Sequence, residues 1–222
     1  MTTSVVYGIA GDGWIESVDG DELDHDGTYA AARAGSGDSI GATATDASNI
    51  WTGQIRVVED FTRYICQEGF VDFNTSVVGT DTVSSAVASY YLLTDTSTTD
   101  FTVQMRVKTW SAGGLTTADW VAGASLTGQT LVAHKATSGI GAAGYKDFTD
   151  DALPANINGA GNSEFILHSD RHSGNNAPTG NEYVVWQDAD YTGTTQDPYL
   201  TIVHTAGGGA TRASNLMLMG IG

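Results

Sequence analysis

The residues of this chain that could do chemistry are its acids, its histidines and its serine–glycine turns. The acidic run Asp19-Gly-Asp-Glu-Leu-Asp-His-Asp26 loosely resembles a calcium loop. A helix–loop–helix calcium site needs oxygen ligands at loop positions 1, 3 and 5, and counting from Asp19 puts Leu23 at position 5. His168 and His172 would share a face only on a helix, but their run starts where a predicted strand ends. We therefore expect no bound metal and no cofactor.

The serines give no sign of nucleophilic catalysis. A nucleophile elbow reads Gly-x-Ser-x-Gly, and neither Ala34-Gly-Ser-Gly-Asp38 nor Thr137-Ser-Gly-Ile-Gly141 fits it. The chain also lacks the phosphate-binding pattern Gly-x-x-x-x-Gly-Lys-Ser/Thr and any Cys-x-x-Cys. Glycosidases hold two carboxyl groups about 5 to 9.5 Å apart, and the sequence does not place any two of the 26 acids at that distance. We predict that the protein is not an enzyme.

Charge and cysteine content exclude several classes of partner. The net charge is −17, and the 9 basic residues are scattered singly. Nucleic-acid binding needs clustered Lys and Arg, and an anionic membrane would repel such a chain, so we expect neither partner.

The N-terminus shows no basic region followed by an apolar run, so the chain is expected to be made in a host cytoplasm without a signal peptide. The single cysteine, Cys66, excludes an internal disulfide and is expected to be buried.

The elements that must position these residues are predicted to be strands. Thr, Val and Tyr are plentiful, helix-favouring residues are scarce, and about eight to ten short alternating runs are separated by turn residues. This pattern predicts an all-β protein built as an antiparallel β-sandwich or jelly roll. We divide the chain into an N-terminal arm with opening strands (1–50), the sandwich (51–205), and a glycine hinge with an apolar C-terminal tip (206–222).

Two of the predicted strands are long and are expected to pair. They cover residues 84–93 and 101–110, with a polar turn at 94–100 between them. The second strand alternates, which predicts one buried and one water-facing side. The buried side would carry Phe101, Val103, Met105 and Val107. The wet side would carry Thr102, Gln104, Arg106 and Lys108.

Tryptophans and the C-terminal tip are the candidate contact sites. Trp110 and Trp186 lie in predicted strands and are expected in the core, whereas Trp120 is the best candidate for an exposed platform that stacks on a glycan. The tip follows Ala206-Gly-Gly-Gly-Ala210, a flexible hinge. It either folds back onto its own sandwich or packs on a neighbouring subunit. The second alternative makes it an assembly contact formed by Leu216, Met217, Leu218, Met219 and Ile221.

Four segments together resemble the DNRLRE-type jelly-roll domain over residues 50 to 205. They are Gly69-Phe-Val-Asp-Phe-Asn-Thr-Ser76, Val83-Ser-Ser-Ala-Val-Ala-Ser-Tyr-Tyr-Leu92, Phe101-Thr-Val-Gln-Met-Arg-Val-Lys-Thr-Trp110 and Asp190-Tyr-Thr-Gly-Thr-Thr-Gln-Asp-Pro-Tyr-Leu200. The resemblance implies a non-enzymatic structural protein of a tailed-bacteriophage virion, expected to decorate the capsid as an auxiliary head protein or to belong to the tail or a fibre. Its partners would be other virion proteins and further copies of itself. The alternative implied by the same resemblance is a carbohydrate-binding module that holds a surface glycan.

Overall fold

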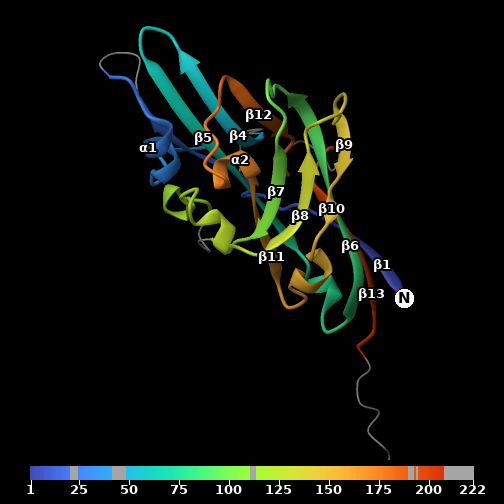
Figure 1. Ribbon diagram of the computed structural model, residues 1–222. Helices are drawn as coiled ribbons and strands as arrows, with labels where there is room; N and C mark the ends of the chain where they lie inside the picture. Colours follow the sequence, from blue (N-terminus) through green and yellow to red (C-terminus); the bar gives the residue numbers. More distant parts are fainter. Residues whose placement is uncertain (21–24, 42–48, 111–113, 190–192, 194, 208–222) are drawn as a thin grey trace, which may run out of the picture.

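The computed structural model describes residues 1–20, 25–41, 49–110, 114–189, 193 and 195–207 (Figure 1). The strands of the described chain are β1 (Thr2–Tyr7), β2 (Gly13–Asp19), β3 (Ser39–Gly41), β4 (Ile50–Val58), β5 (Thr62–Asn74), β6 (Thr82–Asp95), β7 (Thr102–Val107), β8 (Leu131–Ala136), β9 (Gly144–Asp147), β10 (Thr149–Asp150), β11 (Asn162–Ser169), β12 (Asn181–Trp186) and β13 (Tyr199–Thr205). The helices are short: α1 (Tyr29–Ala34), α2 (Asp170–Ser173) and the single 3₁₀ turns η1 (Ser76–Val78), η2 (Thr117–Asp119), η3 (Leu126–Gly128) and η4 (Leu153–Asn156).

All strand pairs of the described chain are antiparallel and join in one sheet. The main path runs β1-β13-β6-β12-β4-β5-β11-β7-β8-β10, while β2 pairs with β5 and with β3, and β9 pairs with β6. The all-β, antiparallel class expected from the sequence is confirmed. The β4–β5 hairpin projects at one pole, and the start of β1 and the end of β13 lie at the other (Figure 1).

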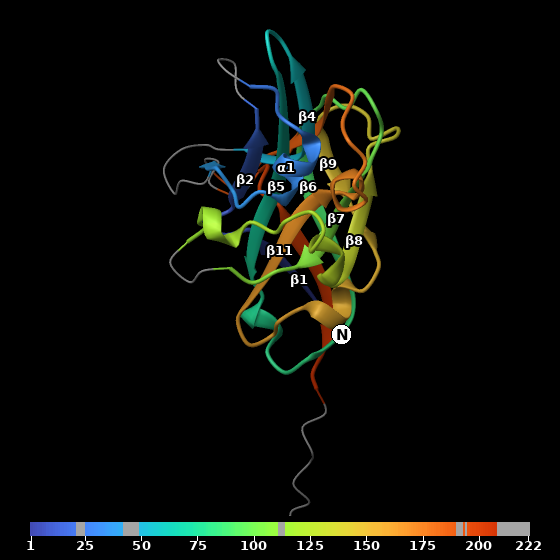
Figure 2. The same cartoon turned by 60° about the vertical axis from the view of Figure 1, so that its left-hand side comes forward.

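The sheet folds over so that its two halves face each other across a common core, as the layers of a sandwich do. Turned by 60°, the view shows β7, β8 and β11 in front of β1 (Figure 2). The main core joins Ala88 and Tyr90 of β6 to Met105 of β7 and Phe165 of β11, all fully buried. The Tyr90 hydroxyl lies 3.6 Å from the Met105 sulfur across this core. β9 pairs with β6 and the following β10 pairs with β8, so this short link ties the two layers together.

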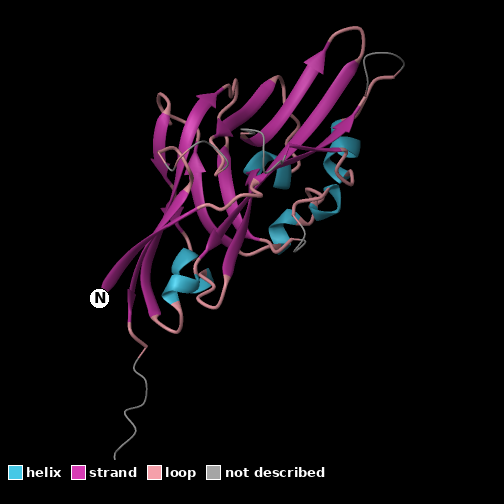
Figure 3. Cartoon of the chain, turned by 180° about the vertical axis from the view of Figure 1, so that it is seen from behind, coloured by secondary structure: helices cyan, strands magenta, loops and turns pink. Residues whose placement is uncertain are grey.

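A second, smaller core lies on the other face of β5 and β11. Phe70 and Ile166 point into it, whereas Val71 and Phe73 point into the main core, as the alternation of β5 predicts. The second core is covered by α1 and by the irregular segment that carries η2 and η3 (Figure 3). β5 is therefore buried on both faces. Cys66 lies in this second core as a buried free thiol, as expected.

Two expectations about the long strands are wrong. β6 and β7 do not pair: β6 lies between β13 and β12, and β7 lies between β11 and β8. The two strands instead face each other across the main core, because alternation decides which side of a sheet a residue faces but not which strand lies beside it. The wet face of β7 is also partly covered, since Arg106 is only 8% exposed. Its guanidinium donates to His168 Nε2 at 3.0 Å and to the Gln129 carbonyl at 2.6 Å.

The first 50 residues belong to the same sheet as the residues that follow them. β1 pairs with β13 over six residue pairs, from Thr2 opposite His204 to Tyr7 opposite Tyr199. β2 pairs with β5 over seven, and α1 packs on both of these strands. Val6 and Ile15 are buried in the main and the second core respectively. The N-terminal segment therefore supplies part of both cores.

Candidate functional site

A pocket of about 370 Å³ lies at the edge of the second core, on the face of the sheet opposite the main core. Its floor is formed by β5 and β11, and its walls by the loop after β1 and by Trp110 and Gly114. The residues that line it are Ile9, Ala10, Gly11, Asp72, Trp110, Gly114, Asn162 and Glu164. A pocket of this size with a few converging polar groups is the usual form of a small-ligand site.

The local sequence explains why two carboxylates meet in this pocket. Asp72 and Glu164 are direct cross-strand partners on β5 and β11, so their side chains leave the sheet on the same side. Asn162, two residues before Glu164 on that same side, donates from Nδ2 to Asp72 Oδ2 at 2.7 Å. The loop after β1 holds the Asp72 backbone, because the Asp72 amide donates to Asp12 Oδ1 at 2.8 Å and the Ile9 amide donates to the Asp72 carbonyl at 3.0 Å.

Burial shapes the electrostatics of this carboxylate pair. Asp72 is 9% exposed, and burial raises the pKa of its carboxyl to about 6, against the opposing hydrogen bond from Asn162. The neighbouring negative charge of Glu164 is a smaller cause of the same rise. Burial also raises the pKa of Glu164, while Thr109, the Trp110 amide and the charge of Lys108 lower it. When both carboxyl groups are ionised, the pocket holds two like charges side by side and partly shielded from water. Their repulsion and lost hydration destabilise the folded protein.

A second notable surface is the outer side of β1, β13 and β6. Val5 of β1 and Val87 of β6 both lie opposite Thr201 of β13, so their side chains point to the same side of the sheet. Tyr7 is two residues after Val5 on β1 and therefore points to that side as well. Their exposed fractions are 51% for Val5, 37% for Val87 and 40% for Tyr7, and we call these three residues the outer patch. A row of ring contacts continues from Tyr7 to Tyr199 at 5.9 Å and from Tyr199 to Tyr145 at 5.0 Å.

A hydrogen-bonded serine, histidine and aspartate lie at the pole that holds the start of β1 and the end of β13. The Ser4 hydroxyl is 3.0 Å from His204 Nε2, and His204 Nδ1 is 2.7 Å from Asp81 Oδ2. The order of contacts is that of a catalytic triad. However, Ser4 lies within the β1–β13 ladder rather than on a sharp turn, and the His204 side chain is only 5% exposed. The arrangement satisfies both ring nitrogens of a buried histidine and links β1, β13 and the start of β6.

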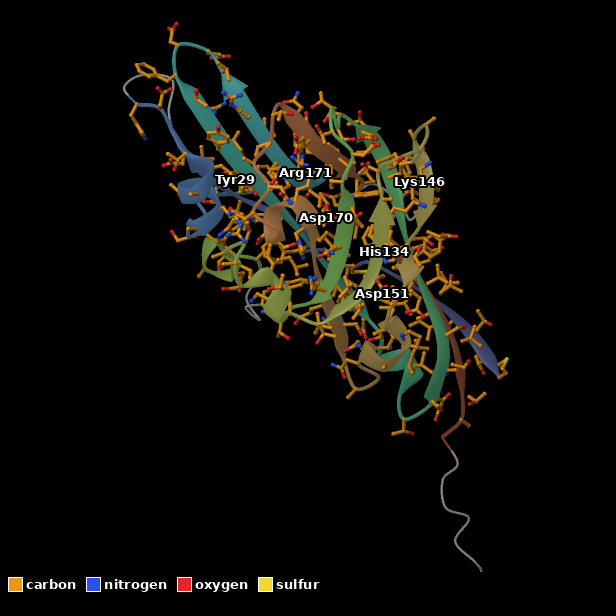
Figure 4. All side chains as sticks on the ribbon, viewed as in Figure 1. Tyr29, His134, Lys146, Asp151, Asp170 and Arg171 are labelled. Atoms are coloured by element: carbon orange, nitrogen blue, oxygen red, sulfur yellow. The ribbon has the colours of Figure 1, made fainter. Side chains whose placement is uncertain are left out.

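Buried polar groups beneath the helices have a structural role. The Tyr29 hydroxyl of α1 donates to Gln54 at 2.8 Å, and Gln54 and Arg171 of α2 both donate to the fully buried Glu182, at 2.9 and 2.7 Å. Tyr29 and Arg171 lie close together in Figure 4. These bonds hold α1 and α2 against β4 and β12. Nearby, burial lowers the pKa of His172 to about 3, and its Nδ1 lies 3.7 Å from the buried Glu68 carboxylate.

The structure places the residues predicted from the sequence as follows. Trp120 is 9% exposed and packs on His172 with ring centroids 5.6 Å apart, so the expectation of an exposed platform is wrong. The segment that carries it folds onto the second core instead of projecting into water. Trp186 is fully buried, whereas Trp110 packs edge-on against Phe70 and also lines the pocket. The apolar tip (Leu216, Met217, Leu218, Met219 and Ile221) lies outside the described residues.

Reasoning from the sequence missed the carboxylate pair. The available signal was an acid inside an otherwise apolar strand, Phe70-Val-Asp-Phe73. The described residues contain no group of three or more His, Cys, Asp or Glu that could hold a metal ion. No helix in the described part of the chain is long and apolar enough to cross a membrane. A scan of protein-family models and a search of curated proteins both give no match to this chain.

Proposed function

We propose that the protein is a non-enzymatic structural component of a tailed-bacteriophage virion that decorates the capsid as an auxiliary head protein, with a tail or fibre position as the variant. The observation that carries this proposal is the outer patch. Val5, Tyr7 and Val87 expose apolar surface on the same side of three consecutive strands, with Thr201 between Val5 and Val87, on a chain whose net charge is −17. A general acidic surface keeps copies apart, so a local apolar area marks where the protein binds another one.

The position of the patch supports an assembly role. It includes Val5 and Tyr7 of β1, which among the described strands forms its ladder with β13 on one side, and an open edge can add a strand from another chain. Thr2 lies opposite His204, so the described chain begins and ends beside the patch. The sequence resemblance to jelly-roll virion proteins points to the same role.

The decisive experiment is localisation. An antibody against the purified protein, applied to phage particles released from cells that make the protein, should label heads at many sites per particle in negative-stain images. Labelling of tails alone would select the variant. Particles that carry no label, with the protein found only in the soluble fraction of the lysate, would refute a virion role.

A matched pair of variants tests the patch itself. Val87→Lys should abolish self-association or binding to isolated capsids, measured by light scattering on a sizing column and by co-sedimentation. Val58→Lys is the control, because Val58 is even more exposed, at 61%, but lies at the far end of β4. Equal loss of assembly in both variants would show that charge in general, and not the patch, decides association.

A further inference from the structure

The pocket between β5 and β11 has the chemistry of a cation site. Asp72 is nine-tenths buried, and its Oδ1 makes no hydrogen bond of standard geometry to the described residues. Glu164 lies directly opposite on β11. Within the described chain, neither carboxylate forms a salt bridge with a Lys or Arg. Two neighbouring carboxylates that make no such salt bridge favour a positively charged ligand.

We propose that this pocket binds the guanidinium group of an arginine side chain presented by a partner protein, held between Asp72 and Glu164 and against the ring of Trp110. A guanidinium is planar and carries five N–H donors, so it can bond to two carboxylates at once and stack on an indole face. An ammonium group is compact and cannot span both carboxylates in the same way.

Other ligand classes fit the described residues less well. A neutral sugar could pack on Trp110, but it would leave the two carboxylate charges uncompensated. Calcium takes six to eight oxygen ligands, whereas this pocket offers two carboxylates and the Asn162 amide oxygen. An anionic ligand would be repelled both by the pair and by the net charge of −17.

The charged neighbours of the pocket set how binding depends on pH. Lys108 lies close enough to lower the pKa of Glu164, Asp119 raises it, and Asp12 holds the Asp72 amide from the loop after β1. None of these replaces a cation between the two carboxylates. Because the pKa of Asp72 is about 6 in the empty pocket, a bound cation has one carboxylate fewer to contact at pH 5 than at pH 8, and its affinity falls.

The test uses a free arginine derivative, so it does not depend on whether the protein belongs to a virion. N-acetyl-L-arginine amide is titrated into ¹⁵N-labelled protein at pH 8, and N-acetyl-L-citrulline amide serves as the neutral analogue of the same shape. We expect the arginine probe to shift the Trp110 indole N–H signal with a millimolar Kd. The Kd of the citrulline probe should be higher by a factor of about ten or more.

Variants separate the pocket from general electrostatics. Asp72→Asn and Glu164→Gln should each weaken the arginine probe about tenfold. Asp60→Asn removes the same charge from the exposed β4–β5 turn and should leave the Kd unchanged. The proposal is overturned if the citrulline probe binds as tightly, if Asp60→Asn weakens binding equally, or if the arginine probe causes no shift. Tighter binding of methyl glucoside or Ca²⁺ at the same residues would overturn it as well.

Discussion

Replacing Asp72 by asparagine should stabilise the folded protein, and the gain should depend on pH. Burial raises the pKa of this carboxyl from 3.8 to about 6. Between these two values the native protein holds a proton that the unfolded chain has released, so stability falls as the pH rises through this window and stays low above it. A shift of about two pKa units corresponds to about 3 kcal/mol as an upper limit. Asparagine carries no charge at any pH and avoids this loss.

The assay is urea unfolding followed by tryptophan fluorescence, at pH 8 and at pH 5, for both proteins. At pH 8 Asp72→Asn should be more stable than the native sequence by up to about 3 kcal/mol. At pH 5, one unit below the native pKa, the native protein has recovered about 1.4 kcal/mol, so the difference should shrink by that amount. Titrating groups away from Asp72 are common to both proteins and cancel, whereas Glu164 loses a charged neighbour in the variant, which adds to the gain at pH 8. A difference that is the same at both pH values, or a variant that is less stable at pH 8, would refute the assignment.

Three further outcomes are expected. Burial lowers the pKa of His172 to about 3, so its ring should stay neutral at pH 5 by ¹⁵N NMR, and its contribution to stability should be lost as the pH falls below 6.5, where the unfolded chain gains a proton. His204→Ala removes the bonds to Ser4 and Asp81 and should cost about 1 to 3 kcal/mol; hydrogen exchange should then accelerate in β1 before the rest of the sheet. Gly53→Ala should cost more than about 2 kcal/mol in thermal unfolding, because φ is +146° and a Cβ would come within 2.3 Å of a carbonyl of β12. Gly128→Ala, which has open space around it, is the control and should change stability by less than about 0.5 kcal/mol.

The sequence predicts the class of fold because the class depends on local alternation. Phe70, Val71 and Phe73 take the faces that their positions require, and the apolar side of β7 is buried as expected. Which strands pair cannot be deduced from local alternation, because pairing depends on contacts between distant parts of the chain. β6 and β7 follow each other in sequence and look like a hairpin, yet they belong to opposite layers.

The candidate site could not be predicted from the sequence for the same reason. Asp72 is recognisable as an acid in an apolar strand, but Glu164 becomes its neighbour only through the β5–β11 register. Asn162, which orients Asp72, is 90 residues away from it along the chain. Trp120 is predicted to be exposed but is buried. It lies in a segment without alternation, so the sequence pattern gives no buried or exposed side. Nothing local indicates that this segment covers a second core.

The position of β13 between β1 and β6 has a consequence for the timing of folding during translation. Ser4 and His204 are 200 residues apart in sequence, and within the described part of the chain the one strand that forms a ladder with β1 is β13. β1 must therefore wait, unpaired, until the last described strand has emerged from the ribosome. Until then β6 also lacks the strand on its β13 side, and Leu200 and Ile202 are missing from the main core. Such long-range closure is slow, and a nascent chain held in this state exposes two strand edges to which other chains can bind.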